Sequence, residues 1–264
     1  MFEKRSRDRA SAKARGKITA VFLPLALALT IGACSIEEQT KEMAISNMVG
    51  DAAQAAVARR DFAAAANHFG RMYVRDPSNL EVLLQYLENL RRIGAIEDAY
   101  RITQKERANH GDDTRFLLAQ GKVELAAGKA GDAIETFASA RDKGLREWEL
   151  FSAMGIAYDM GRRYDEAGAA YQTALGLSPG NPTVLNNMAL SMAQAGDIDG
   201  AIELLRHVVF EEGKDSPRIR QNLALLYGFK GDIAQLEALA RIDLGEDMVQ
   251  RNVATFKSLG KKSE

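Results

Sequence analysis

The sequence repeats with a period of 34 residues, and this period limits the possible folds more than any other feature. A shift of 34 carries Gly121 to Gly155. Units that begin at residues 46, 80, 114, 148 and 182 share a small twentieth residue, namely Ala65, Ala99, Ala133, Ala167 and Ala201. A sixth unit begins near residue 217, after a shift of 35 that indicates one extra residue in the turn around Gly213–Pro217. Repeats of this length bury their apolar faces against neighbouring repeats, so the period predicts a stacked array.

The unit at residues 148–181 indicates what each repeat folds into. Gly155 and Ala167 are small where two helices would cross closely, and Tyr158 and Tyr171 would fill the space between them. Pro179 has no amide donor and would therefore end the second helix. The unit resembles the tetratricopeptide repeat (TPR) family at Phe151, Met154, Gly155, Tyr158, Ala167, Tyr171, Ala174 and Pro179. The resemblance implies an all-α fold, a right-handed TPR superhelical solenoid of about six helix-turn-helix repeats plus a C-terminal capping helix.

Four parts are expected along the chain. Residues 1–33 form a signal peptide, residues 34–45 a flexible linker, residues 46–250 the TPR array, and residues 246–264 the capping helix and tail. The capping helix is expected to cover the end of the stack with one side, which carries Met248, Val249, Val253, Phe256 and Leu259. The sixth unit departs from the pattern at Ile233-Ala234-Gln235-Leu236, where the expected small twentieth residue is displaced.

The N-terminal segment has the layout of a secretory signal. Residues 1–17 carry seven Lys or Arg, and residues 18–33 are almost wholly apolar and end in small side chains. This run has 16 residues and contains Pro24, whereas a spanning helix needs about 20, so a permanent transmembrane anchor is the weaker interpretation.

The only cysteine of the chain, Cys34, directly follows Ile31-Gly32-Ala33. This pattern resembles the lipobox of bacterial lipoproteins. The resemblance implies cleavage before Cys34 and attachment of lipid to its thiol, which would anchor the protein to a membrane. Because Ser35 rather than Asp follows, it also implies the inner leaflet of a Gram-negative outer membrane, facing the periplasm.

Charge and missing motifs argue against several functions. The chain has a net charge of −1, but residues 1–33 hold seven basic and two acidic residues, so the remainder carries −6. Such a chain lacks the basic surface that nucleic acids require. His68, His110 and His207 lie in different repeats with no second ligand at helical spacing, so no metal is expected. Without a nucleophile, a catalytic base or a phosphate loop, we expect no cofactor, no small-molecule substrate and no enzymatic activity.

The first helices of such a stack line a concave surface that binds segments of other proteins. Their second, fifth, sixth and ninth residues are expected to face this groove. In the last two units these are Thr183, Asn186, Asn187, Leu190, Arg218, Gln221, Asn222 and Leu225. Amides can both donate to and accept from a peptide backbone, and Arg218 could hold a carboxylate. The alternative, that these are ordinary solvated polar residues, stays open.

The C-terminal stretch carries a second resemblance. Its matching residues are Arg218, Arg220, Gln221, Asn222, Leu223, Ala224, Gly231, Ala240, Asp243, Leu244, Asn252 and Leu259. They resemble the end of the TadD family, the TPR lipoproteins of tight adherence (Flp) pilus systems. The resemblance implies a periplasmic assembly or pilot factor whose partner is the outer-membrane secretin or another Tad component.

A different TPR lipoprotein scaffold is the alternative, such as a type IV pilus pilotin or an adaptor for peptidoglycan hydrolases. Only the C-terminal resemblance separates the two. A pilus ATPase, prepilin and secretin encoded beside this chain would favour the first interpretation, and a peptidoglycan hydrolase would favour the second.

Overall fold

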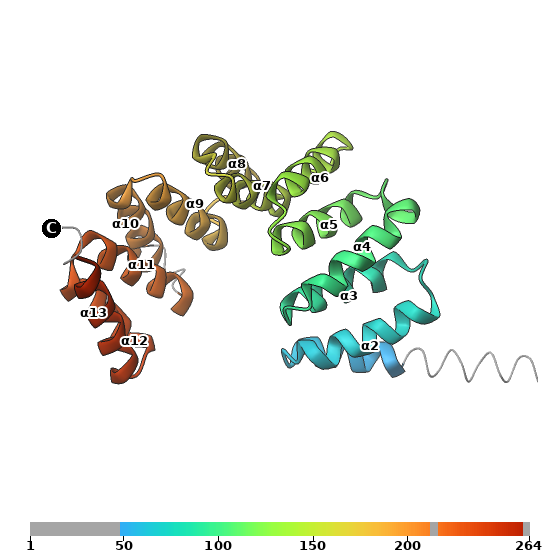
Figure 1. The fold of residues 1–264 in the computed structure, drawn as a ribbon, viewed down its shortest axis with the longest axis horizontal. Coiled ribbons are helices and arrows are strands. Elements are labelled where there is room, and N and C mark those ends of the chain that lie inside the picture. The colour runs from blue at the N-terminus through green and yellow to red at the C-terminus, as the bar shows by residue number, and fades with distance from the viewer. Residues whose placement is uncertain (1–47, 212–215, 261–264) are drawn as a thin grey trace, which may run out of the picture. The chain divides into compact units, whose positions relative to one another are not determined.

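The computed structural model describes residues 48–211 and 216–260, and all regular structure in them is helical (Figure 1). The expected all-α repeat architecture is therefore confirmed. The predicted signal peptide, Cys34 and the linker at residues 34–45 lie outside the described residues. A helical segment at residues 48–58 is followed by α2 (Phe62–Arg75), α3 (Leu80–Arg92), α4 (Ile96–His110), α5 (Thr114–Ala126), α6 (Ala130–Asp142), α7 (Trp148–Met160), α8 (Tyr164–Leu177), α9 (Pro182–Gln194), α10 (Ile198–Arg206), η1 (His207–Glu211), α11 (Pro217–Lys230), α12 (Ile233–Asp243) and α13 (Glu246–Gly260).

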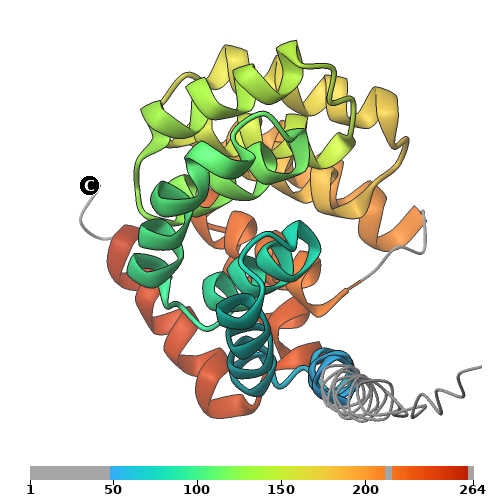
Figure 2. The same cartoon turned by 90° about the vertical axis from the view of Figure 1, so that its right-hand side faces the viewer.

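The helices pack as consecutive pairs, which Figure 2 shows from the side. The first helices of the pairs are α3, α5, α7, α9 and α11, and each packs against the second helix that follows it. Successive first helices also touch one another, whereas successive second helices lie farther apart over the described residues. The first helices therefore form a continuous layer of their own within the unit Gly50–Glu264.

In the pairs α5–α6 and α7–α8, residues of complementary size hold the two helices together. A Cβ added to Gly155 would lie 2.5 Å from the ring of Tyr171, and one added to Gly121 would lie 2.3 Å from the ring of Phe137. Both rings are buried. In the unit that begins at residue 80 the sizes are exchanged, because Leu87 takes the place of the glycine and Thr103 takes the place of the ring; both are buried. Tight packing of this kind leaves no room for a second large residue.

The turns inside the pairs share one backbone conformation. The fifteenth residue of each unit has a positive φ, namely 59° at Arg60, 77° at Gly94, 74° at Gly128, 57° at Arg162, 100° at Gly196 and 86° at Gly231. Glycine adopts this conformation without steric cost, whereas the two arginines adopt it at a cost of about 1 kcal/mol each. The repeat therefore dictates this turn even where the residue disfavours it.

Side-chain caps and prolines fix where several helices begin. The Asn181 side chain accepts hydrogen bonds from the amides of Thr183 and Val184, and Pro182 occupies the first turn of α9. Ser216 caps α11 in the same way, with Pro217 in its first turn. Capping residues satisfy amides that have no partner in the helix, and proline has no amide to satisfy.

The sixth unit shows how its departure from the pattern is accommodated. Leu236 stands at the twentieth place and is buried. The space for it comes from Gly228 on α11, where an added Cβ would lie 2.6 Å from Leu236 and 2.8 Å from Phe256 of α13. The small residue has thus moved from the second helix of the pair to the first.

The capping helix α13 buries fewer residues than the sequence suggested. Val249, Val253 and Phe256 are buried against the last pair, whereas Met248 and Leu259 are 44% and 47% exposed. The expectation that all five residues share the covered side was therefore wrong for these two. Val249, Val253 and Phe256 follow the i, i+4, i+7 spacing of one helix face, and the other two fall at its margins.

The unit that begins at residue 182 ends irregularly. Its second helix, α10, continues into the π-helical turn η1, and residues 212–215, which contain part of the predicted insertion around Gly213–Pro217, lie outside the described residues. Hydrogen bonds in a π-helix skip one more residue than those in an α-helix. The helix is therefore wider at His207–Glu211, directly before the turn that is predicted to contain the extra residue.

Replacing Gly155 with alanine tests the size complementarity. Gly155→Ala is expected to lower the free energy of unfolding by about 2 kcal/mol, because the new methyl group collides with the Tyr171 ring. Gly168→Ala is the matched control, since no atom lies within 4 Å of its added Cβ and alanine favours the helix by about 1 kcal/mol. Urea unfolding measures both, and equal effects from the two substitutions would contradict the packing described.

Candidate binding groove on the first helices

The side chains at the second, fifth, sixth and ninth places of the first helices surround a series of hollows, which we name the first-helix groove. Between α3 and α5 they line a hollow of about 360 Å³. The contributing residues are Glu81, Leu84, Gln85 and Glu88 from α3, and Arg115, Leu118, Ala119 and Lys122 from α5.

The groove continues across α7 and α9. A hollow of about 410 Å³ is lined by Lys122, Glu149, Ser152, Ala153, Ile156, Thr183 and Asn187, together with Trp148 and Met160. A further hollow of about 220 Å³ between α9 and α11 is lined by Thr183, Asn186 and Arg218. Lys122 and Thr183 each belong to two hollows, so the three hollows follow one another along the first-helix layer.

The predicted amides lie together but bond chiefly to one another. Asn222 donates from Nδ2 to Oδ1 of Asn186 at 2.7 Å, and Asn187 donates from Nδ2 to Oγ of Ser152 at 3.4 Å. Asn186 is only 2% exposed, so it holds Asn222 in place and has little surface for a ligand. Asn187 is partly exposed and its long bond to Ser152 is weak, which leaves it more capacity for a bound segment.

The remaining candidates are spread along the C-terminal part of the groove. Arg218 is exposed at the hollow that Asn186 also lines. Gln221 and Leu225 line a smaller hollow of about 100 Å³ beside α12 and α13, and Leu225 is 39% exposed. Leu190 is partly buried and lines none of these hollows.

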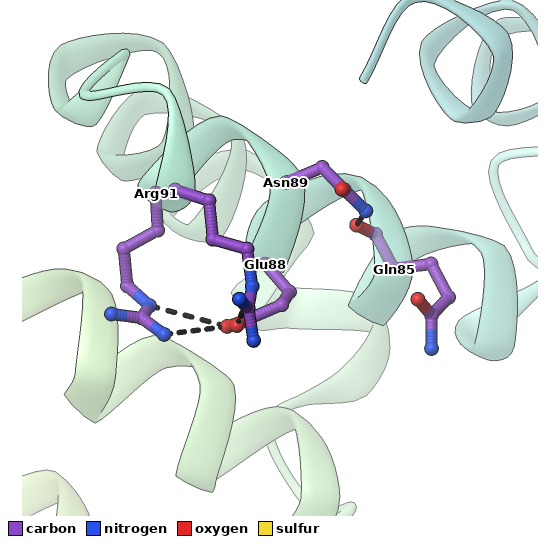
Figure 3. Close-up of polar contacts among 5 residues, drawn as sticks. Gln85, Glu88, Asn89 and Arg91 are labelled. Carbon is purple, nitrogen blue, oxygen red and sulfur yellow. Dashed lines mark hydrogen bonds and ion pairs between the residues drawn. The ribbon is translucent and has the colours of Figure 1, made fainter. Parts of the chain in front are cut away.

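The N-terminal part of the groove contains an ion-pair cluster. Figure 3 shows Glu88 facing Arg91, which donates to Glu88 Oε2 from Nη2 at 2.7 Å and from Nε at 3.2 Å, while Arg92 donates to Oε1 at 2.7 Å. Burial alone would raise the pKa of Glu88, but the hydrogen bonds from the two arginines outweigh it, and the pKa is lowered. Beside this pair, Asn89 donates to the carbonyl oxygen of Gln85 at 2.7 Å. These contacts, all within α3, orient the side chains on this wall of the groove.

Lys122 differs from these groups because its amine forms no hydrogen bond or ion pair with the described residues. Its pKa is lowered, chiefly because burial disfavours the charged form; Glu88 opposes the shift. Lys122 also stands where the two largest hollows of the groove meet. A carboxylate from a bound segment would offset the cost of burying this amine. Sequence reasoning stopped at the last two units and missed Lys122, although the same places of the repeat point to it.

Among residues 48–211 and 216–260, no group of three or more His, Cys, Asp or Glu residues is arranged to hold a metal ion. His68, His110 and His207 lie on separate second-helix segments.

No helix in the described part of the chain is both long enough and apolar enough to cross a membrane.

Two of the residues on which the resemblance to the TadD family rests form a nearly buried ion pair. Arg220 on α11 donates to the two carboxylate oxygens of Asp243, from Nε at 2.9 Å and from Nη2 at 2.6 Å. The side chains are 14% and 9% exposed. The hydrogen bonds from Arg220 lower the pKa of Asp243. These two residues join the last pair of helices, which is a structural role.

Consecutive helix pairs with a groove along one layer define a helical-repeat scaffold. Comparison with known families agrees: a model of the tetratricopeptide repeat matches residues 160–226, and a model of the TT21 fifth ARM repeats domain matches residues 43–154. No curated protein sequence matches the chain significantly.

Solved structures share the fold at low sequence identity. A thermophilic TPR protein of Thermus thermophilus superposes with a TM-score of 0.61 at 18% identity and covers 69% of this chain and 98% of its own. A tetratricopeptide repeat protein of Parabacteroides merdae gives 0.60 at 14% identity, covering 82% and 92%. The MamA protein of Desulfovibrio magneticus gives 0.52 at 17% identity, covering 65% and 97%. The chain thus contains a segment that matches the tetratricopeptide repeat, and it has the helical-repeat fold of these solved structures.

Replacing Asp243 with asparagine tests the buried pair. Asp243→Asn is expected to lower the free energy of unfolding at pH 7 by about 2 kcal/mol, because Arg220 loses a charged partner in a nearly dry site. The pKa of Asp243 is lower in the folded chain, so this contribution is complete above its ordinary value of 3.8 and is lost as the pH falls through the folded value.

The matched control is Asp199→Asn, which breaks a pair with Lys230 whose side chains are 77% and 50% exposed. This control is expected to change stability by less than about 0.5 kcal/mol. Urea unfolding at pH 7 and at pH 3 measures the free energy of unfolding of both variants and of the unchanged chain. A deficit in Asp243→Asn that is equally large at both pH values would contradict the assignment.

Proposed function

We propose that this protein is an assembly factor of a tight adherence pilus, anchored to the outer membrane by lipid at Cys34. Its first-helix groove holds a segment of the outer-membrane secretin in the periplasm. The observation that carries the binding role is the run of hollows from α3 to α11, lined by equivalent places of successive repeats. The support for the pilus system is the TadD-like C-terminal stretch, which contains Arg220, Asn222 and Asp243.

The groove lining favours a partner segment in an extended form. Asn187 and Thr183 can bond to a backbone without requiring a particular side chain on the ligand. Lys122 favours an acidic residue in the segment, since its amine has no other bonded partner among the described residues. Ile156 and Met160, which are 38% and 48% exposed beside it, favour an apolar residue nearby. We therefore expect the bound segment to combine an acidic and an apolar side chain.

Lipid attachment gives this groove a fixed location. The lipobox-like residues before Cys34 and the serine after it support an anchor in the inner leaflet of the outer membrane. A protein held there meets secretin subunits within one membrane layer, which raises their effective concentration near the groove.

Replacing Lys122 with glutamine tests the groove. Lys122→Gln is expected to weaken capture of the secretin by about tenfold, because an acidic side chain of the segment loses its partner. Thermal stability should stay the same or rise, since the substitution removes a partly buried charge. Asn187→Ala is expected to weaken capture to a smaller extent.

The matched control is Lys257→Gln on α13, which removes a lysine away from the groove. Pull-down of the co-expressed secretin and thermal unfolding measure both properties in the same variants. Unchanged capture by Lys122→Gln would contradict the proposed mode of binding, and so would an equal loss in Lys257→Gln.

Replacing Cys34 with alanine tests the anchor. The Cys34→Ala protein is expected to leave the membrane fraction and to keep its helical circular dichroism, because the thiol that would carry the lipid is gone. Ser35→Ala is the control and should remain in the membrane fraction. Membrane retention of Cys34→Ala after a high-salt wash would refute lipid anchoring and leave the groove proposal untouched.

A further inference from the structure

A separate hollow lies on the other side of α5 from the first-helix groove. It has a volume of about 500 Å³ and is lined by α5 and by the second helices α4 and α6, and we name it the second-helix hollow. Its lining includes Gln120 and Glu124 from α5, Tyr100 and Arg107 from α4, and Asp132 and Glu135 from α6. Helix α5 thus presents Lys122 to the groove and Gln120 and Glu124 to this hollow.

Gln120 and Glu124 break the repeat pattern at two core places. They are the seventh and eleventh residues of their unit, and they are 1% and 3% exposed. The same places in the other five units hold no charge or amide: Ala52, Tyr86, Met154, Met188 and Leu223 at the seventh, and Ala56, Leu90, Tyr158, Met192 and Tyr227 at the eleventh. Stacking of the repeats therefore does not require polar residues here.

The two polar side chains satisfy each other only in part. Gln120 donates from Nε2 to Oε1 of Glu124 at 2.7 Å. Oε1 of Gln120 and Oε2 of Glu124 are buried and accept no hydrogen bond from the described residues. A buried carboxylate with an unused oxygen costs stability unless a donor reaches it. A pair without an amide or a charge, as in the other units, would avoid that cost.

The charged residues around the hollow indicate which kind of hydrogen-bond donor would fit there. Glu124, Asp132 and Glu135 are acidic, and Arg107 is the one cationic side chain among the described residues that line the hollow. Arg107 is exposed and forms no ion pair with them. Tyr100 is partly exposed in the lining and can contact an apolar stem; its ring already has the Lys129 ammonium 5.0 Å from its centroid, so it accommodates a cation on an alkyl chain. The ligand that fits is a cation with several N–H donors at the end of an alkyl chain.

We propose that the second-helix hollow binds the side chain of an arginine or lysine of a protein partner, with Glu124 and Gln120 as its acceptors. The site is separate from the first-helix groove, so the protein has two faces for two protein contacts. Binding requires a small rotation of the Glu124 carboxylate toward the hollow, because its free oxygen is covered in the unbound chain.

The test uses the purified full chain and three small probes: N-acetyl-arginine amide, N-acetyl-lysine amide and the uncharged isostere N-acetyl-citrulline amide. Amide chemical shifts in NMR spectra report the site and the affinity. We expect the arginine probe to perturb residues 100–139 and to bind at least tenfold more tightly than the citrulline probe. Equal binding of arginine and citrulline would overturn the proposal, as would perturbation elsewhere only.

Two variants separate a binding role from a structural one. Glu124→Gln should bind the arginine probe at least tenfold more weakly with an unchanged or higher melting temperature, whereas Glu203→Gln on the exposed side of α10 should change neither. Arg107→Gln should bind about threefold more tightly, because a competing cation is removed. A large fall in melting temperature without loss of binding in Glu124→Gln would assign Glu124 a structural role and overturn the proposal. Tighter binding of spermidine than of either amino-acid probe would overturn the assignment to a protein side chain.

Discussion

The close approach of the two helices in each repeat is the contact on which the rest of the structure depends. At Gly155 the α7 backbone meets the Tyr171 ring so closely that a methyl group has no space. This contact fixes the angle and depth of the pair, and the same choice of one small and one large residue recurs at Gly121 and Phe137. The first helices of successive pairs also pack on one another, and the hollows of the groove lie along the layer that they form.

Several polar side chains of this stack are buried or nearly buried. They differ in how many of their hydrogen-bond donors and acceptors have partners. Arg220 and Asp243 satisfy each other across α11 and α12, so they serve packing. Asn186 receives its hydrogen bond from Asn222 and orients it. Gln120 and Glu124 keep unused acceptors beside a hollow. Unused acceptors beside a hollow are what distinguishes Gln120 and Glu124 from Arg220, Asp243 and Asn186, and they are the basis of the proposed second binding site.

Much of the architecture could be predicted from sequence, because each repeat period contains two helices and the turn between them. A residue's place within the unit also indicates whether it faces the groove. The period could not reveal that Asn186 is covered by its neighbours, because burial depends on the next unit and not on the residue itself. It also could not show that Gly228 makes room for Leu236, since that compensation links two helices and α13.

Site-specific photocrosslinking tests most directly whether the first-helix layer is the binding surface. A photoreactive residue would be placed at Ala119 or Thr183 in the groove, and at Gln172 on the exposed side of α8 as the control. The account predicts that both groove positions crosslink to one short segment of the secretin and that Gln172 does not. Crosslinks from Gln172 with none from Ala119 or Thr183 would contradict it.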